Sequence, residues 1–339
     1  MQARNYSVDY AKAIGIILVV YGHVATGIYN AGINVPVELY KLIDSIIYSF
    51  HMPLFFFLSG LFFYKSFVKR GALKLVNSKI DSILYPYIIW SIIQGLIQAR
   101  LSTYTNSDSN YNEIFFILWS PIAQFWFLHA LFVFFCLSVI IFSIINRKYA
   151  SVIFLLSIAV YIIPVLPNEL WFLSKNFVFF LFGIIFSFKC NINMFLSKKS
   201  MCVLFALFIF GQYVFHIILG MNYTEKGVLS LLLSIISILF VISLSSFLSR
   251  TPNRLFITIG KSSLVIYLMH ILAGSGVRVI LKNFMGVDSH IIHLICGFIA
   301  GLFIPVFASI MIKKLSMQYL LSAPISHSIE LLFRRLKPA

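Results

Sequence analysis

Residues 48–60 read YSFHMPLFFFLSG, an apolar run interrupted by one histidine and one proline. A stretch so rich in Phe and Leu belongs in hydrocarbon, where an imidazole and a missing amide N–H are both costly. Pro53 cannot donate to the carbonyl of Ser49, so the sequence predicts a kink and a polar partner for that carbonyl. Ser59 and Gly60 are small, which favours close approach of another helix. We therefore expect one wall of a polar cavity inside a bundle of membrane helices.

The whole chain has the composition of a membrane protein. Of its 339 residues, 60% are hydrophobic and only 11% are charged, unlike an ordinary globular domain. A helix needs about 20 apolar residues to cross the hydrocarbon. Ten such runs follow one another: 12–29, 43–64, 82–100, 126–145, 150–167, 170–188, 201–220, 228–248, 262–283 and 291–312. Because nine further runs follow it, the first is expected to be a retained helix rather than a signal peptide. The runs 150–167 and 170–188 are short and nearly touch, which favours a tight turn between them.

The basic residues are concentrated on one predicted side of the membrane. If the N-terminus is cytoplasmic, 20 of the 26 Lys and Arg residues fall in cytoplasmic segments, as the positive-inside rule predicts. The net charge of +16 therefore indicates topology and not a nucleic-acid partner. We predict an all-α polytopic protein of a bacterial plasma (inner) membrane, with a ten-helix domain over residues 1–312 and both ends in the cytoplasm. Residues 313–339, which include ELLFRRLK, are expected to form a basic amphipathic tail on the bilayer surface.

Disulfides and metals find little support in the sequence. The four cysteines lie in or beside the apolar runs and show no paired spacing. His290 and His293 are three residues apart, but no third or fourth ligand with suitable spacing is apparent beyond Asp288. We expect no metal site.

Polar residues inside the runs are the candidates for chemistry. His23 lies about halfway along the first run, and Lys12 lies 11 residues earlier at its cytoplasmic end. Three helical turns separate them, so both share one face about 16 Å apart. Asp9 can pair with Lys12 if the helix begins that early. A cation at the mouth and a base at depth suit a ligand with an anionic headgroup and a long flexible arm, such as coenzyme A. Alternatively, Lys12 anchors the helix by snorkelling and His23 only bonds a neighbouring helix.

Three further side chains are expected near this site or at its outer end. His51 lies about 13 residues from the cytoplasmic end of the second run, at a depth similar to that of His23, and is predicted to orient the catalytic group. His270 lies at a comparable depth in the ninth run, where a role in the cavity and a structural hydrogen bond are both open. Trp126 lies at the outer interface, where it belongs to an aromatic belt or stacks on a sugar.

Four segments resemble successive signatures of the acyltransferase-3 family of integral-membrane acyltransferases. They are VDYAKAIGIILVVYGHV (8–24), FHMPLFFFLSG (50–60), FWFLHALF (125–132) and IGKSSLVIYLMH (259–270), and the resemblance extends from about residue 5 to 312. It implies about ten helices and transfer of an acyl group, commonly acetyl from acetyl-CoA, to a hydroxyl of a cell-envelope sugar. It also implies that His23 is the catalytic residue.

The sequence departs from the family pattern at two basic positions. Lys12 stands where the family usually has arginine, which keeps the charge but loses the bidentate fork. A second family signature has two arginines before the third helix; the matching stretch KIDSILYP has Lys79 at the first position and Ser82 at the second. Arg70 or Lys74 could supply the missing cation.

With this resemblance, the sequence predicts an O-acyltransferase. Neutral His23 would take the proton of a sugar hydroxyl or carry the acyl group itself, while Lys12 and Lys79 hold the phosphates of acetyl-CoA or another acyl-CoA. The acceptor would be an envelope saccharide or a lipid-linked sugar, and the bilayer is the other partner. Two alternatives stay open. A flippase or other transporter for a lipid-linked sugar would be expected to have rows of intramembrane charges, and this sequence does not show them. An envelope polysaccharide polymerase would need a sizeable external loop, which only residues 101–125 approach.

Overall fold

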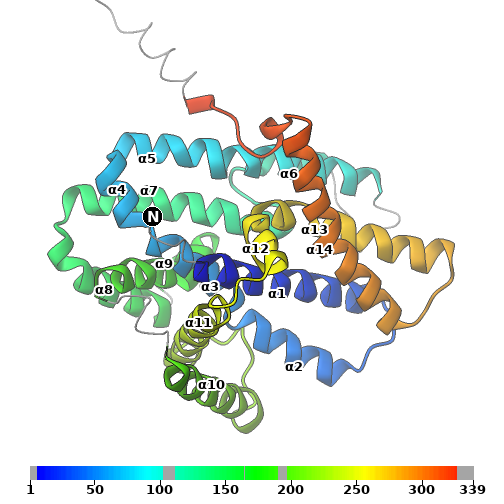
Figure 1. Cartoon of the computed structure of the whole chain (residues 1–339), viewed down its shortest axis with the longest axis horizontal. Coiled ribbons are helices and arrows are strands. Elements are labelled where there is room, and N and C mark those ends of the chain that lie inside the picture. Colours follow the sequence, from blue (N-terminus) through cyan, green and yellow to red (C-terminus); the bar gives the residue numbers. More distant parts are fainter. Residues whose placement is uncertain (1–5, 102–110, 164, 190–196, 327–339) are drawn as a thin grey trace, which may run out of the picture.

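Long helices lying side by side make up the structure (Figure 1), a computed structural model that describes residues 6–101, 111–163, 165–189 and 197–326. The α-helices are α1 Ser7–Asn30, α2 Val37–Tyr48, α3 His51–Leu61, α4 Phe63–Arg70, α5 Ala72–Lys79, α6 Tyr85–Arg100, α7 Trp126–Ile144, α8 Ala150–Ile162, α9 Trp171–Lys189, α10 Lys198–Tyr213, α11 Val228–Leu248, α12 Arg254–Lys261, α13 Ser263–Val279 and α14 His290–Lys314. These described residues contain no strand, so the all-α prediction is confirmed.

Nine helical segments of the described chain are long and apolar enough to cross a membrane. They are Ser7–Asn30, Val37–Arg70, Ala72–Arg100, Ala123–Ile144, Asn168–Lys189, Lys198–Ile218, Val228–Leu248, Ser263–Phe284 and His290–Lys314. The predicted run 150–167 differs, because α8 has only 13 residues and is about 20 Å long, short of the roughly 30 Å of hydrocarbon. The polytopic bundle is confirmed with nine long segments in the described residues, and the short helix α8 stands where the sequence predicts a tenth.

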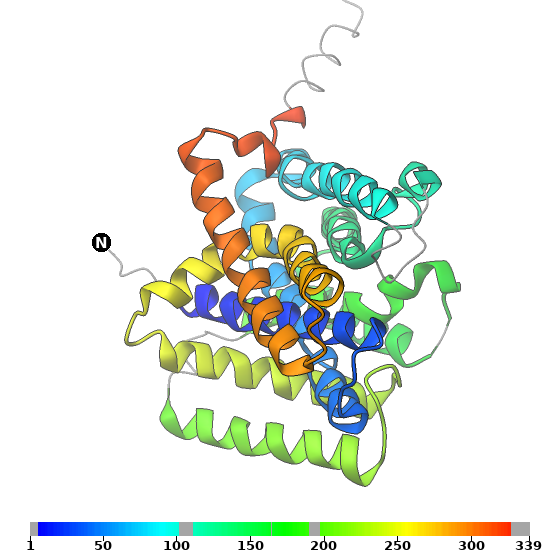
Figure 2. The same cartoon turned by 90° about the vertical axis from the view of Figure 1, so that its right-hand side faces the viewer.

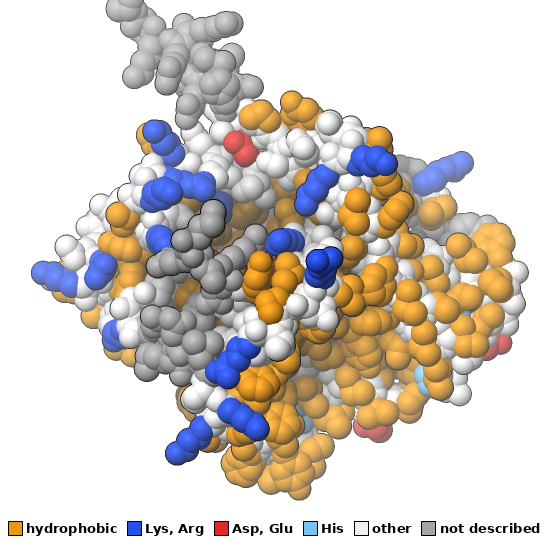
Figure 3. Space-filling model, in the orientation of Figure 1, with side chains coloured by type: hydrophobic (Ala, Val, Ile, Leu, Met, Phe, Trp, Pro, Cys, Tyr) orange, Lys and Arg blue, Asp and Glu red, His pale blue; other side chains and the backbone are white. Residues whose placement is uncertain are grey.

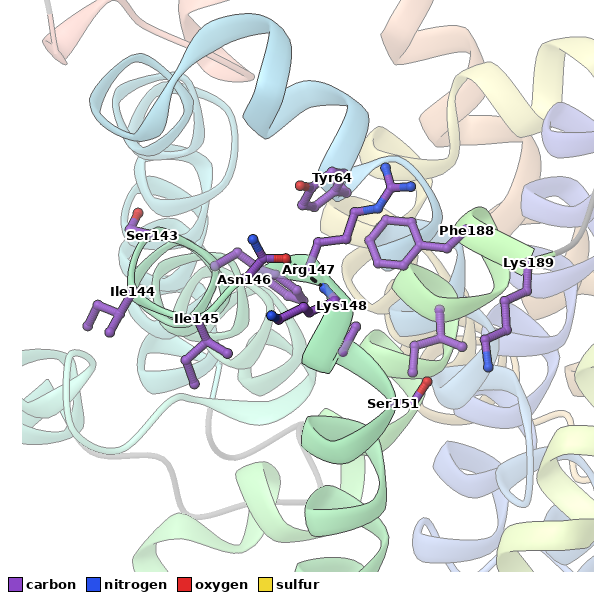
Figure 4. Close-up of a pocket in the computed structure, with 13 residues that line it drawn as sticks. Tyr64, Ser143, Ile144, Ile145, Asn146, Arg147, Lys148, Ser151, Phe188 and Lys189 are labelled. Atoms are coloured by element: carbon purple, nitrogen blue, oxygen red, sulfur yellow. Dashed lines mark hydrogen bonds between the residues drawn. The ribbon is translucent and has the colours of Figure 1, made fainter.

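The short helix α8 still returns the chain across the bundle. The end of α7, the start of α8 and the end of α9 line one pocket (Figure 4) and so lie at the same end of the molecule. The chain must therefore cross from that end to the far end of α9 between Ala150 and Trp171. The sequence predicts a turn around Pro164 and Pro167; Pro167 lies at that far end, and Pro164 lies outside the described residues.

The break before His51 follows the predicted chemistry of Pro53. Helix α2 ends at Tyr48 and α3 begins at His51, which places the proline in the first turn of α3. A proline is tolerated there because that N–H has no partner within the helix. The hydroxyl of Ser234 on α11 donates to the freed carbonyl of Ser49 at 2.7 Å. Both the kink and the polar partner are confirmed.

Helix α1 lies at the centre of the bundle and contacts α2, α3, α11, α12, α13 and α14. Figure 2 shows α1 between crossing helices α13 and α14 and the layer formed by α10 and α11. At the start of α1, the hydroxyl of Tyr10 donates to the carbonyl of Thr251 at 3.3 Å and accepts from the N–H of Asn253 at 2.6 Å. Gly260 of α12 lies directly on the carbonyl of Asp9. The segment before α13 is thus fixed over the beginning of α1.

Several predicted cytoplasmic segments meet at the end of the bundle where α1 begins. Figure 3 shows many Lys and Arg side chains over the half of the view where the N-terminus lies. Residues of the predicted tail fold back onto α6 and the π-helical turn before it: the indole N–H of Trp90 donates to the carbonyl of Leu320 at 2.8 Å, and the hydroxyl of Ser326 donates to Asp81 at 2.6 Å. The amphipathic ELLFRRLK lies outside the described residues. Which end faces the cytoplasm, and the domain boundary at residue 312, stay predictions.

Candidate active site

Three histidines from different helices lie together in the middle of the bundle. The ring centroids of His23 on α1 and His270 on α13 are 5.0 Å apart. Tyr48, the last residue of α2, lies between the other pair, 6.4 Å from His23 and 4.6 Å from His51. The sequence predicted that His23, His51 and His270 lie at similar depth. The structure brings all three to one place, and their roles stay predictions.

The backbone holds two of the three imidazoles in a defined orientation. His51 Nδ1 is 2.8 Å from the carbonyl of Ile47, and His270 Nδ1 is 2.8 Å from the carbonyl of Tyr267. Because a carbonyl only accepts, Nδ1 donates in each ring and Nε2 is left as the acceptor of the neutral imidazole. Nε2 of His270 is buried and has no hydrogen-bond partner among the described residues.

His23 differs from its neighbours in exposure. His51 and His270 are 1% and 0% exposed, whereas His23 is only half-buried. His23 is therefore the one histidine of this group that retains accessible surface.

A basic group lies toward the start of α1. Lys79 lies close enough to Lys12 and Arg70 for the three positive charges to interact, and its Nζ is 4.2 Å from the ring centroid of Phe135. Arg70 is oriented by a 2.7 Å hydrogen bond from Nη1 to the hydroxyl of Ser78. Lys12, Arg70 and Lys79 thus form a group of three cations near the start of α1.

Arg70 is the second cation beside Lys79. Ser82, which stands where the resemblance leads one to expect a second arginine, carries no charge. The hydroxyl of Ser82 donates to the carbonyl of Ser78 at 2.6 Å. It lies in a π-helical turn, Ile80–Leu84, which immediately precedes the proline of the first turn of α6. Such turns arise where the regular helical hydrogen bonding is interrupted.

Two of the predicted orienting residues are not joined to the histidines by any described contact. Trp126 packs among other aromatic side chains, with ring centroids 5.0 Å from Trp171 and 6.2 Å from Phe56. Asp9 lies in the first turn of α1, under Gly260. A sugar-stacking role for the tryptophan and the pairing of Asp9 with Lys12 stay predictions.

Sequence reasoning missed Tyr48 and Asp44, which lie at the opposite end of the histidine group from Lys12. The hydroxyl of Thr26, one turn after His23, donates to Oδ1 of Asp44 at 3.4 Å. The signal was present in the sequence, because Asp44 is the one carboxylate in the apolar run 43–64 and an ionisable group in such a run is a functional candidate.

A separate pocket of about 700 Å³ lies where α7 and α9 end. In Figure 4, Arg147 extends between Tyr64 and Phe188; its guanidinium carbon is 5.7 Å and 5.1 Å from the two ring centroids. No histidine lines this pocket. It is therefore distinct from the site around His23.

The family of the chain follows from a comparison with family models. Residues 5–313 match the family model of the acyltransferase-3 family, described as an acyltransferase domain. The chain belongs to this acyltransferase family, which confirms the resemblance read from the four motifs.

Two curated relatives share only part of their length with this chain. Nodulation protein NolL of Mesorhizobium japonicum is 26% identical over 184 residues, which are 54% of this chain and 48% of the relative. Nodulation protein NolL of Sinorhizobium fredii is 27% identical over 183 residues, 52% of this chain and 49% of the relative. The chain thus spans about half the length of the curated relatives it matches. No solved structure matches it.

Proposed function

We propose that this protein transfers an acyl group, most directly acetyl, from an acyl-CoA to a hydroxyl of an envelope saccharide or lipid-linked sugar in a bacterial plasma membrane. The observation that carries the proposal is the partly accessible imidazole of His23, grouped in the middle of the bundle with the buried, backbone-oriented His51 and His270. Family membership supplies the class of reaction. The acceptor and the donor are the parts that we infer.

His23 is suited to act as the base. In its neutral form, one ring nitrogen accepts the proton of the attacking hydroxyl as the oxygen bonds to the thioester carbonyl carbon. The tetrahedral intermediate then collapses, the C–S bond breaks, and the coenzyme A sulfur leaves with the proton that the imidazolium returns. In the acyl-carrier variant, the ring nitrogen itself attacks the thioester, the thiol leaves, and the hydroxyl then attacks the acyl-imidazole.

The basic group at the start of α1 is suited to hold the donor. Lys12, Lys79 and Arg70 would bind phosphates of coenzyme A by charge-assisted hydrogen bonds. Lys12 and His23 are both on α1, about 16 Å apart along the helix, a distance that the flexible pantetheine arm can extend across. The thioester would then reach His23 from that end.

The two alternatives read from the sequence find less support. A flippase moves its cargo without breaking a thioester and has no use for a general base. A polymerase joins sugars and needs no coenzyme A site. The family match over residues 5–313 favours the acyltransferase over both.

The test is thioester consumption in proteoliposomes that contain the purified protein, acetyl-CoA labelled in the acetyl group, and saccharide acceptors. The wild type should release free coenzyme A and label the acceptor, whereas His23→Ala should lose transfer by about 10²-fold or more, as expected for loss of a general base. His290→Gln, at the start of α14, is the matched control and should keep full activity. Saccharide transport or polymerisation without thioester cleavage, or normal transfer by His23→Ala, would refute the proposal.

A further inference from the structure

Asp44 occupies an unusual position for a carboxylate. It is half-buried on α2, within a candidate membrane span. It accepts a hydrogen bond from the hydroxyl of Thr26, which is also 3.3 Å from the donating hydroxyl of Tyr40. A carboxylate has acceptor sites for about four hydrogen bonds. Most of the capacity of Asp44 is therefore available to a ligand.

Aromatic rings surround this carboxylate. Its charge acts on Tyr40 and Tyr48 from its own helix and on Tyr223 from the connection between α10 and α11. The rings of Tyr48 and Tyr223 are 5.2 Å apart. Burial, and secondly the nearby carboxylate, raise the pKa of the Tyr223 phenol, which keeps it protonated and able to donate. We call Thr26, Tyr40, Asp44, Tyr48 and Tyr223 the Asp44 cup.

The cup is built into the fold rather than formed by a loose loop. The hydroxyl of Ser45 accepts the backbone N–H of Tyr223 at 2.9 Å, which fixes the α10–α11 connection onto α2. Lys226 donates to the carbonyl of Tyr223 at 2.8 Å.

Nearby cations are bound to the backbone instead of to Asp44. Arg278 and Lys282 donate to the carbonyls of Gly27 and Ala31 at the end of α1. Among the described residues, none forms an ion pair with the carboxylate of Asp44.

The cup lies next to His23 along α1. Thr26 follows His23 by one helical turn, which places their Cα atoms about 5 Å apart along one face, and the ring of Tyr48 is 6.4 Å from that of His23. All the members of the cup are half-buried, as is His23, whereas His51 and His270 are fully enclosed. Each member of the cup and His23 thus retains some accessible surface, and the cup lies on the side of His23 away from Lys12.

We propose that the Asp44 cup is the binding site for the acceptor saccharide. Sugars are recognised by carboxylates that accept several hydroxyl protons and by aromatic rings that pack on their C–H faces, and the cup offers both. Asp44 is a positioning residue that orients one hydroxyl toward His23, while the donor reaches His23 from the Lys12 end. This inference rests on the proposed function for its reaction, but not for the binding of saccharide.

Direct binding separates the two proposals. The probe is fluorescently labelled oligosaccharide released from the surface polysaccharide of the host bacterium, and purified wild-type protein should bind it without acyl-CoA. Asp44→Asn keeps the size of the side chain and should raise the Kd roughly 10-fold or more, the loss expected for hydrogen bonds to a charged acceptor. Glu38→Gln is the control, since Glu38 is exposed at the start of the same helix.

Kinetics give the second readout. In the transfer assay, Asp44→Asn should raise the KM for the acceptor by the same factor and leave the KM for acetyl-CoA unchanged, with an unaltered thermal transition. Saccharide binding without any acyl transfer by the wild type would refute the proposed function but not the assignment of the cup as a saccharide-binding site. Absence of binding by the wild type, an unchanged Kd in Asp44→Asn, or an equal rise in both KM values would overturn the assignment of the cup.

Discussion

His51 and His270 share a local hydrogen-bonding arrangement that His23 does not show. In each, the ring Nδ1 lies within hydrogen-bond distance of the carbonyl four residues earlier, at 2.8 Å for Ile47 and 3.0 Å for Ile266. Such a bond fixes both the tautomer and the ring plane. A ring held in this way is suited to orient a neighbour, and a ring with accessible surface is suited to meet a substrate. This difference supports the division between a base and two positioning residues.

The hydrogen bond that Ser234 makes can be tested by mutation, because its hydroxyl satisfies the carbonyl that Pro53 leaves free. In Ser234→Ala, the carbonyl of Ser49 loses its 2.7 Å donor next to the start of α3. We expect a loss of about 1 kcal/mol of stability, the usual range for an interhelical hydrogen bond in a membrane. Thermal unfolding in one fixed detergent measures it.

Ser246→Ala on the same helix is the matched control. Its hydroxyl is buried but has no hydrogen-bond partner among the described residues, so its removal should change the transition little. An equal shift in the two variants would mean that the bond to Ser49 contributes nothing specific.

At the scale of elements, α3 and α9 are packed through two glycines. A Cβ at Gly60 would overlap the carbonyl oxygen of Phe180, and a Cβ at Gly183 would overlap that of Phe57. Backbone atoms cannot rotate away as a side chain can, so the helices would have to separate. This agrees with the prediction from the sequence that Ser59 and Gly60 permit close approach.

Gly60→Ala should therefore destabilise the protein by about 3 kcal/mol or more, at the upper end for overpacking of a core. Gly276→Ala on α13 is the control, because nothing lies within 4 Å of the added methyl group. The measurement is again the thermal transition, together with the fraction of protein recovered in monodisperse form. A Gly60→Ala protein as stable as Gly276→Ala would contradict the packing of α3 on α9.

The sequence is informative about elements and depths and less so about contacts. Helical period alone places Lys12 and His23 on one face of α1, and the position of Pro53 predicts the break before His51. The sequence leaves Arg70 and Lys74 open as the second cation beside Lys79, because the turn at Gly71 between α4 and α5 decides which of them lies there. The Asp44 cup depends on a connection more than 170 residues further along the chain.

The whole molecule is polarised along α1. Basic residues surround the end where α1 begins, and a carboxylate with several tyrosines lies toward the other end, with the histidines between them. Such an arrangement suits a donor and an acceptor that approach from opposite sides. It requires that the two ends of α1 face different compartments.

The path of the chain through α8 gives the sharpest test of this topology. Lys148 lies before α8 and Glu169 lies after it, and both are exposed. If the chain crosses the bundle between Lys148 and Glu169, Lys148→Cys and Glu169→Cys will react with a membrane-impermeant maleimide from opposite faces. In intact cells, Glu169→Cys should be labelled and Lys148→Cys only after permeabilisation, because Lys148 lies in a segment that the positive-inside rule places in the cytoplasm.

Labelling of the unsubstituted protein, which has four cysteines of its own, is the control. Equal labelling of both variants from one face would mean that α8 does not cross, and the prediction that both termini are cytoplasmic would then be wrong.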